Sequence, residues 1–436
     1  MSRVSRVVRS WAAAFGAVAA TLALADVAVG QTYAIQGGTI HTLAGDAFVG
    51  TVVVRDGRIL EVGPNVQAPA GAEVVDATGR HVYPGMFDAV SQLGLTEIGA
   101  VDMTNDSEEQ GDFKPHLQAA TAIHPSTEHI PVARANGITH TMSAPEGGII
   151  AGQASLVGLD GWTVEEMDIE PGAAMVVNYP SLSPRRRWGG FGFGAERSFS
   201  DIEQQHREQV ARLDEWMEAG RMHVKSAAAG EAGRNLQLEA MAHVIDREMP
   251  VLLSANGERD IKNAVEWAER QNIRYVITGG GEGWKIADWL AERDVEVILG
   301  PSQAMPAGPD EEYDEAYANA GRLYAAGVKI AFATFSSSDS RTLPYEAAMT
   351  VPFGLPQEAA LEAVMKNGAE MLGLGDRMGT IEPGKIANLI VTDGNPLEIQ
   401  TQILDLFILG RQVSTENKHK SLYDKYRARP KDRVIS

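Results

Sequence analysis

The sequence contains no cysteine in its 436 residues. Without cysteine there is no disulfide bond and no lipid anchor attached through sulfur, so packing alone must hold the fold together. Basic residues are also scarce relative to acidic ones: 38 lysines and arginines stand against 58 aspartates and glutamates, a formal net charge of -20. Such a charge opposes binding to nucleic acid or to an anionic membrane.

The apolar run near the N-terminus is too short to span a membrane. It reads "WAAAFGAVAATLALA", about 15 residues against the roughly 20 that a spanning helix needs. Arginines precede the run, and small residues follow it as far as Gly30. This pattern predicts a secretory signal peptide over residues 1–30, cleaved after Gly30. We therefore expect an exported protein, periplasmic or extracellular, with no membrane span after cleavage.

Both ends of the remaining chain are patterned as short strands with turns. In residues 31–83, "TVVVRDGRIL" alternates around Asp56 and Gly57, which predicts a hairpin. In residues 379–415, "GTIEPGKIANLIVTDGNPLE" and "ILDLFILGRQV" have hairpin spacing. We expect the two segments to form one small β-sandwich domain, followed by a basic, solvated tail over residues 416–436.

Residues 84–378 alternate between strand-like apolar runs and helical patterns. For example, "MPVLLSAN" precedes "ERDIKNAVEWAERQN", and "IRYVITGG" precedes "GWKIADWLAERD". Such alternation predicts a parallel sheet, and at this length a closed barrel is favoured over an open sheet. The predicted fold class is therefore α/β, a (β/α)8 TIM barrel inserted between the two halves of the β-sandwich.

One loop is rich in glycine and aromatic residues. It reads "SPRRRWGGFGFGAERSFS" and contains the segment Arg185 to Gly194. Because no strand flanks it and the Lys-Ser/Thr pair of a phosphate-binding loop is missing, a phosphate site is the weaker interpretation. We predict a surface lid or an interface loop, since aromatic side chains are enriched where surfaces associate.

Several stretches together resemble one enzyme family. They are "VYPGMFDAVSQLGL", "PVLLSAN" with the helical segment that follows it, "LPYEAAMTVPFGLPQEAALEAVMKNGAEMLGLGDRMGTIEPGKIANLIVTDGNPL", and "DLFILGRQV". In these the chain resembles the metal-dependent amidohydrolase superfamily, in its imidazolonepropionase-like branch. The resemblance implies a barrel with a two-ended β-sandwich, hydrolysis of carbon-nitrogen bonds, and zinc or another divalent metal at the strand ends.

The positions at which that resemblance places metal ligands hold other residues in this sequence. They are Val90 and Gln92 for the histidine pair of the first strand, Ser254 for the fifth strand, Thr278 and Gly279 for the sixth, and Phe335 for the aspartate of the eighth. The fourth-strand ligand has no identifiable counterpart. Val90 and Phe335 have no lone pair to offer a metal, and Gln92 has only a neutral amide oxygen. These substitutions predict an erased metal centre, and we expect no cofactor.

Other polar side chains are candidates for the wall of the vacant pocket. They are Asp88, Glu97, His116, Glu146, Asn256, Glu282, Asp339 and Arg341. A metal centre rebuilt from the four histidines between residues 116 and 140 is an alternative, but no pair of them has H-x-H or H-x3-H spacing. The run "FSSSDSR" lacks the G-x-S-x-G elbow of a serine hydrolase. For Asp88 we expect a scaffold role, accepting backbone N–H bonds at a strand end.

The leading hypothesis is an exported amidohydrolase-like protein that is not catalytic and serves as a binding or partner subunit. Its partner would be a homologue that kept its metal, or a second copy of the chain in a homo-oligomer. One alternative is an active hydrolase of carbon-nitrogen bonds in small or peptide-like substrates, using a non-standard site. Another is a binder of a small molecule in the same pocket. Fold resemblance alone does not choose among them.

Overall fold

The computed structural model describes residues 31–182, 198–306 and 312–429. The predicted signal peptide, the Arg185 to Gly194 loop and the last seven residues lie outside the described residues. Within the described part of the chain, no helix is both long enough and apolar enough to cross a membrane.

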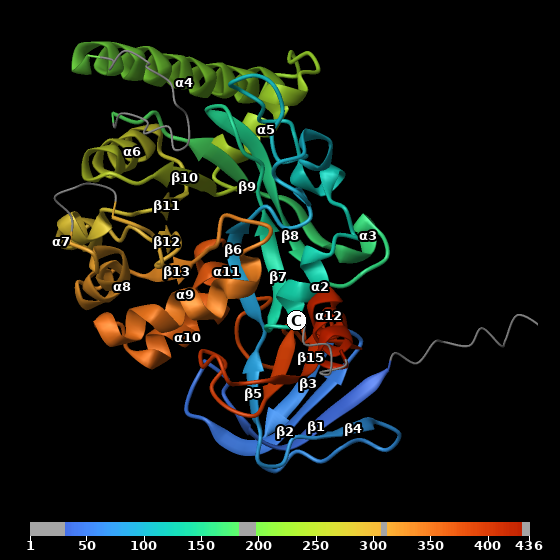
Figure 1. The fold of residues 1–436 in the computed structure, drawn as a ribbon. Helices are drawn as coiled ribbons and strands as arrows, with labels where there is room; N and C mark the ends of the chain where they lie inside the picture. The colour runs from blue at the N-terminus through green and yellow to red at the C-terminus, as the bar shows by residue number, and fades with distance from the viewer. Residues whose placement is uncertain (1–30, 183–197, 307–311, 430–436) are drawn as a thin grey trace, which may run out of the picture.

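One sheet is built from both ends of the chain (Figure 1). Its strands are β1 (Thr32–Ile40), β2 (Phe48–Arg55), β3 (Arg58–Gly63), β4 (Glu73–Asp76), β5 (His81–Pro84), β14 (Leu389–Thr392), β15 (Ile403–Ile408) and β16 (Arg411–Val413). Their order is β16-β15-β14-β5-β1-β2-β3, with β4 paired to β1. The antiparallel pairing of β5 with β14 joins the two ends. The predicted hairpin turn lies between β2 and β3, where Asp56 and Gly57 both have positive φ.

The second sheet forms a nearly closed barrel of eight strands. Its strands, in both sequence and spatial order, are β6 (Met86–Ser91), β7 (Ile138–Ser143), β8 (Ile150–Gly158), β9 (Asp168–Asn178), β10 (Val251–Ala255), β11 (Tyr275–Gly279), β12 (Val297–Leu299) and β13 (Ile330–Phe332). The first and last strands meet where the backbone N–H of Phe335 donates to Val90 O at 2.9 Å. The sequence-based expectation of an α/β barrel beside a sheet from both ends is therefore confirmed at this level.

Strand β8 departs from the strict alternation of strand and helix. It runs antiparallel to both of its neighbours, β7 and β9, whereas the other pairs in the barrel are parallel. The connection from β7 to β8 has room only for a tight reversal, and a parallel crossover needs a dozen or more residues. The sequence reasoning missed this because β8, "IAGQASLVG", is buried along its whole length and shows no two-residue alternation.

Helices surround the barrel strands. They are α2 (His129–Arg134), α3 (Val164–Met167), α4 (Phe199–Ala228), α5 (Leu236–Ile245), α6 (Glu258–Gln271), α7 (Ala287–Ala291), α8 (Glu315–Ala325), α9 (Leu343–Thr350), α10 (Gln357–Met365) and α11 (Asn367–Met371), with α12 (Lys418–Arg427) near the C-terminus. The short 3-10 turns are η1 (Asp102–Thr104), η2 (Ala119–Ala122), η3 (Gly283–Ile286), η4 (Ser340–Thr342) and η5 (Val351–Phe353). The described part of the predicted tail is thus an exposed helix, capped by the Asn417 side chain.

Helix α6 shows why this sequence folds as it does. Its apolar residues recur at helical spacing and are fully buried at Ile261, Ala264, Val265 and Ala268. The helix ends at Asn272, whose left-handed φ of 54° suits a C-terminal cap. Because α6 follows directly on β10, its first turn lies at the carboxyl end of that strand, the end at which barrel proteins build their sites.

Candidate functional site at the mouth of the barrel

A cavity of about 560 Å³ opens at the carboxyl ends of the barrel strands. Its wall is formed by residues at the ends of β6, β9, β10 and β11, by the loop after β7, by the start of α6 and by Phe335. Five of the six positions that the sequence assigned to vacant ligands lie in this wall: Val90, Gln92, Ser254, Thr278 and Phe335. The sixth, Gly279, ends β11 with a φ of +96°, and an added Cβ there would lie 2.4 Å from Asn256 Oδ1.

The side chains at these positions do not fit a divalent metal. Val90 and Phe335 offer no donor atom, and the hydroxyls of Ser254 and Thr278 are neutral. Across the described residues there is no group of three or more histidines, cysteines, aspartates or glutamates that could hold a metal ion. The fourth-strand ligand again has no counterpart in Lys225, a lysine near that position in the sequence, because Lys225 lies within α4 and not on a barrel strand.

Gln92 has a specific partner in place of a metal. Its Nε2 donates to Glu146 Oε1 at 2.6 Å, linking the end of β6 to the loop after β7. Glu146 is exposed to the cavity, yet the protein around it raises its pKa, first by desolvation and then by the negative charge of Glu108. The Gln92 amide opposes this rise by stabilising the carboxylate. A neutral amide and two carboxylates therefore share this side of the cavity.

Asp88 lies in β6, two residues before the cavity residue Val90, and is fully buried. Its carboxylate accepts bonds from the backbone N–H of Thr334 at 3.0 Å, the Thr334 hydroxyl at 2.5 Å and the Ser340 hydroxyl at 2.8 Å. Burial raises the pKa of Asp88 from 3.8 to about 7, against the opposing effect of these bonds. Asp88 thus ties the first barrel strand to the segment that follows the last.

Asn256 lies in the cavity wall with Glu146, but the other six predicted side chains, Asp88 among them, do not. Glu282 accepts the backbone N–H of Glu258 at 2.7 Å at the start of α6. Asp339 and Arg341 bond within their own turn, to Ser336 and to the main-chain oxygen of Ser338. Glu97 binds the Thr127 hydroxyl, and its main-chain oxygen binds His129. The buried Nδ1 of His116 has no hydrogen-bond partner among the described atoms.

The histidines between residues 116 and 140 do not converge. His124 pairs with Asp106 at 2.7 Å on the surface, whereas His140 is buried in β7 and stacked on Phe87. Burial lowers the pKa of His140 to about 3, so this imidazole is neutral. The rebuilt metal centre considered from the sequence therefore finds no support in the described residues.

The structure also places residues in the wall that sequence reasoning did not select. These are Glu108, Asn178, Tyr179, Ser181 and Asp260 among the polar ones. Asp260, in the first turn of α6, accepts the Ser181 hydroxyl and the backbone N–H of Leu182. The signal that could have found it is its place just after "PVLLSAN", where a strand end passes into a helix. No sequence pattern marks Glu108, because a β-bridge to Glu146, which is distant in sequence, brings it to the cavity.

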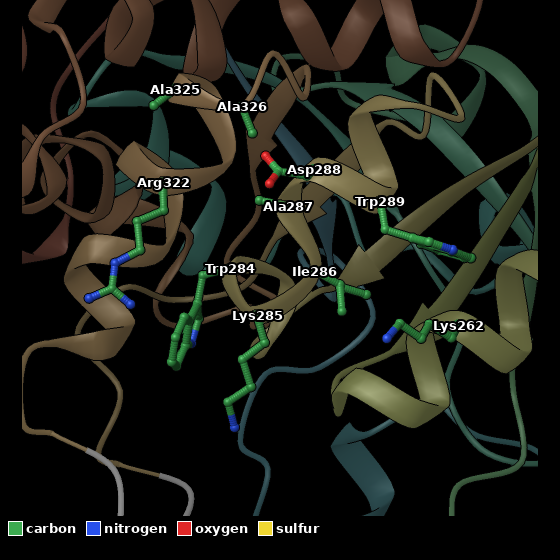
Figure 2. Close-up of a pocket in the computed structure, with 10 residues that line it drawn as sticks. All are labelled: Lys262, Trp284, Lys285, Ile286, Ala287, Asp288, Trp289, Arg322, Ala325 and Ala326. Atoms are coloured by element: carbon green, nitrogen blue, oxygen red, sulfur yellow. The ribbon is translucent and has the colours of Figure 1, made fainter.

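A second hollow, of about 580 Å³, lies on the outer helices around Trp284 (Figure 2). The Arg322 guanidinium lies 4.5 Å from the centroid of the Trp284 ring, and Lys285 Nζ lies 5.4 Å from it. Each nearby cation has an acidic partner: Lys262 with Glu258, Lys285 with Glu282, and Arg322 with Glu315. This hollow has its cations paired and lies away from the strand ends. We therefore take the cavity at the barrel mouth as the candidate site.

Comparison with known proteins places the fold. Residues 164–417, more than half of the chain, match the model of the Amidohydrolase family. The chain belongs to the amidohydrolase family. A solved amidohydrolase from Thermotoga maritima is 25% identical, with a TM-score of 0.74, and covers 88% of this chain and 99% of its own.

Curated amidohydrolase relatives extend the comparison. The amidohydrolase tasK of Hapsidospora irregularis is 24% identical over 83% of this chain and 40% of its own length. Imidazolonepropionase of Methylobacterium nodulans is 28% identical over 32% of this chain and 33% of its own. D-hydantoinase of Geobacillus stearothermophilus is 37% identical over 21% of this chain and 19% of its own. The chain therefore spans well under half the length of these relatives. The predicted resemblance to the amidohydrolases, with an imidazolonepropionase among the relatives, is confirmed.

The comparisons contradict one expectation, that the protein takes no cofactor. The match is to a family whose members use divalent metals, and one structural neighbour, an adenosine deaminase from Xanthomonas campestris, is described with bound zinc. That neighbour has a TM-score of 0.51 and is 18% identical, covering 91% of this chain and 97% of its own. We correct the expectation accordingly. The substituted positions describe the cavity wall and are not evidence that the protein is free of metal.

Proposed function

We propose that this amidohydrolase-family protein binds a small molecule at the barrel mouth without hydrolysing it, as a binding or partner subunit. The observation that supports it is the replacement of the expected ligands around one cavity by Val90, Gln92, Ser254, Thr278 and Phe335. We interpret the nearly closed barrel as a TIM barrel in which β8 has reversed its direction. The proposal concerns what these side chains do, and it holds with or without a metal elsewhere in the protein.

The chemistry of the wall supports retained binding and lost hydrolysis. Cleavage of a carbon-nitrogen bond needs a water activated by a metal or by a base positioned beside it. Val90 and Phe335 present only carbon at the mouth, and the Gln92 amide is engaged by Glu146. The cavity nevertheless combines apolar surface with a few polar groups, which is the usual character of a small-molecule site.

The test measures turnover and binding separately. Full-length protein, supplied in turn with zinc, manganese and no added metal, is assayed with a hydantoin, an imidazolone and a set of dipeptides. We expect no turnover of any of these, and thermal stabilisation by at least one cavity ligand. The matched variants are Glu146→Gln in the cavity and Glu215→Gln on the exposed face of α4. Turnover that Glu146→Gln abolishes and Glu215→Gln leaves intact would overturn the proposal.

That same outcome would favour the second candidate, an active hydrolase with a non-standard site. The specific observation in its favour is Glu146, whose raised pKa is a property of general acids and bases in enzymes. Its signature would be a pH profile of turnover that shifts in Gln92→Ala, because the Gln92 amide holds the Glu146 pKa down.

Export and pairing are parts of the proposal with their own tests. Mass spectrometry of protein from the native cell envelope should give a mature N-terminus near Gln31, and an intact N-terminus would contradict export. Mild extraction should bring down a metal-competent homologue at constant ratio. A lone monomer or a pure homo-oligomer would count against the partner-subunit role and leave ligand binding as the function.

A further inference from the structure

The charged side chains that line the cavity at the barrel mouth, in the part of the chain that the structure describes, are all acidic. Among the described residues that line it, Glu108, Glu146 and Asp260 are carboxylates, and none is a lysine, arginine or histidine. The three come from separate parts of the chain: the segment before α2, the loop after β7 and the first turn of α6. Glu108 and Glu146 are exposed, Asp260 is buried, and all three line the cavity of about 560 Å³.

Two of these carboxylates lie at one edge of the cavity. A Cβ added to Gly147, the neighbour of Glu146, would lie only 2.0 Å from Glu108 Oε1, so the Glu108 carboxylate rests on this glycine. The Glu146 carboxylate accepts a hydrogen bond from the neutral Gln92 amide. The buried Lys114 donates to the main-chain oxygens of Glu109 at 2.6 Å and Glu146 at 3.4 Å, and it does not line the cavity. The edge therefore concentrates negative charge.

Another part of the wall is formed by aromatic and aliphatic side chains. The rings of Tyr179 and Phe335 and the side chains of Val90 and Leu252 line the same cavity. Aromatic faces attract a cation placed over them, and aliphatic side chains pack against the carbon skeleton of a ligand. A molecule with one positive group and an apolar body would match both parts of the wall.

We infer that the cavity takes a small organic cation, an amine or guanidine with an apolar body, whose charged group lies at the Glu108–Glu146 edge. This inference rests on the proposed function of the same cavity and names its ligand class. When the ligand binds, the two carboxylates exchange their contacts with water for charge-assisted hydrogen bonds to its charged group. The apolar body lies against Val90 and Phe335.

Binding of such a cation is coupled to a proton. The groups around Glu146 are Gln92, Glu108 and Lys114, which bonds the Glu146 main-chain oxygen, and Asp260 lines the same cavity. In the free protein, burial and Glu108 hold the Glu146 pKa above its ordinary value. A bound cation favours the ionised carboxylate, so affinity should rise as pH rises through that pKa, with release of a proton.

The test is isothermal titration of the full chain with three probes of one shape: phenethylamine, the neutral 2-phenylethanol and the anionic 3-phenylpropionate. We expect the amine to bind at least about tenfold tighter than the other two, because only the amine can donate charge-assisted hydrogen bonds to the two carboxylates. Glu146→Gln and Glu108→Gln should each weaken amine binding, whereas Glu215→Gln should not. Equal affinity for the amine and the alcohol, or amine binding unchanged in both cavity variants, would overturn the inference.

Two further outcomes separate this inference from the proposed function. If zinc or manganese binds stoichiometrically at the Glu108–Glu146 edge and displaces the amine, the edge is an inorganic cation site and the inference fails. If a cationic amide, such as phenylalanine amide, binds with the expected selectivity and is hydrolysed, the inference stands and the non-catalytic role fails. If a neutral or anionic probe binds selectively and is not turned over, the inference fails and the non-catalytic role stands.

Discussion

Asp88 offers the sharpest test of how the barrel is closed. Replacing it with alanine leaves the Thr334 backbone N–H without its acceptor and removes a partner from the hydroxyls of Thr334 and Ser340. The Thr334 hydroxyl has a second acceptor, Ser336 O at 3.3 Å, so it is partly compensated. With an orphaned buried donor costing ~1–3 kcal/mol, we expect Asp88→Ala to lower the free energy of unfolding by about 3 kcal/mol at mildly acidic pH.

The pH dependence of this loss has a definite sign. The folded-state pKa of Asp88, about 7, lies above its ordinary value of 3.8. The stabilising contribution of the neutral acid is therefore complete below the unfolded pKa and is lost as pH rises through about 7. A shift of this size corresponds to about 4 kcal/mol. Ionisation should thus offset most of what the hydrogen bonds contribute, and the loss caused by Asp88→Ala should shrink towards zero by about pH 8.

The assay is urea denaturation followed by circular dichroism, at about pH 5 and about pH 8, on wild type, Asp88→Ala and Asp88→Asn. The asparagine variant keeps an acceptor and cannot ionise, so its stability relative to wild type should improve as pH rises. Ser340→Ala, which removes a single donor, should cost about 1 kcal/mol and serves as the control for loss of one bond. An unchanged stability of Asp88→Ala at both pH values, or a loss that grows with pH, would refute the reasoning.

Three other substitutions test separate features. Gly147→Ala should lower the free energy of unfolding by ~1 kcal/mol or more, because Gly147 has a φ of +74° and the new Cβ would meet Glu108. The control is Gly45→Ala, where nothing lies within 4 Å of the added Cβ, and equal melting temperatures of the two variants would contradict the prediction. Gln92→Ala should raise the Glu146 pKa further, because the amide bond is the contribution that lowers it; a carbon-13 NMR titration measures this, and a fall would count against the contact. Trp267→Phe should cost about 1 kcal/mol in urea denaturation through loss of the indole N–H bond to Asp214 at 2.9 Å, and no change would exclude a stabilising role for that bond.

Local patterns predicted those parts of the fold whose determinants are local. The Asp56-Gly57 turn, the α6 apolar stripe and the strand of "PVLLSAN" are each specified by a few neighbouring residues, and the structure contains all three. The reversal of β8 could not be found in this way. Its direction is set by the short connection from β7 and by pairing with β9, while its own residues are buried and carry no periodic signal.

The candidate site was predictable only where it follows the strand ends. Val90, Gln92, Ser254 and Thr278 lie in the cavity because the carboxyl ends of neighbouring barrel strands meet at one face. Glu97, Asp339 and Arg341 were chosen for their chemistry and their nearness in sequence, but local turns hold them elsewhere. Glu108 and Asp260 were missed because long-range pairing and a helix start bring them to the cavity.

Phe335 contributes both to the wall of the cavity and to the closure of the barrel. It is a non-glycine residue with a φ of 51°, a conformation that is costly unless the surroundings fix it. Its N–H bond to Val90 O, next to the bonds that Asp88 makes with Thr334, supplies that constraint. The same segment therefore closes the last strand onto the first and presents an aromatic ring to the cavity. The bonds of Asp88 to Thr334 and the backbone bond of Phe335 to Val90 thus fix both the closure of the barrel and one side of the cavity.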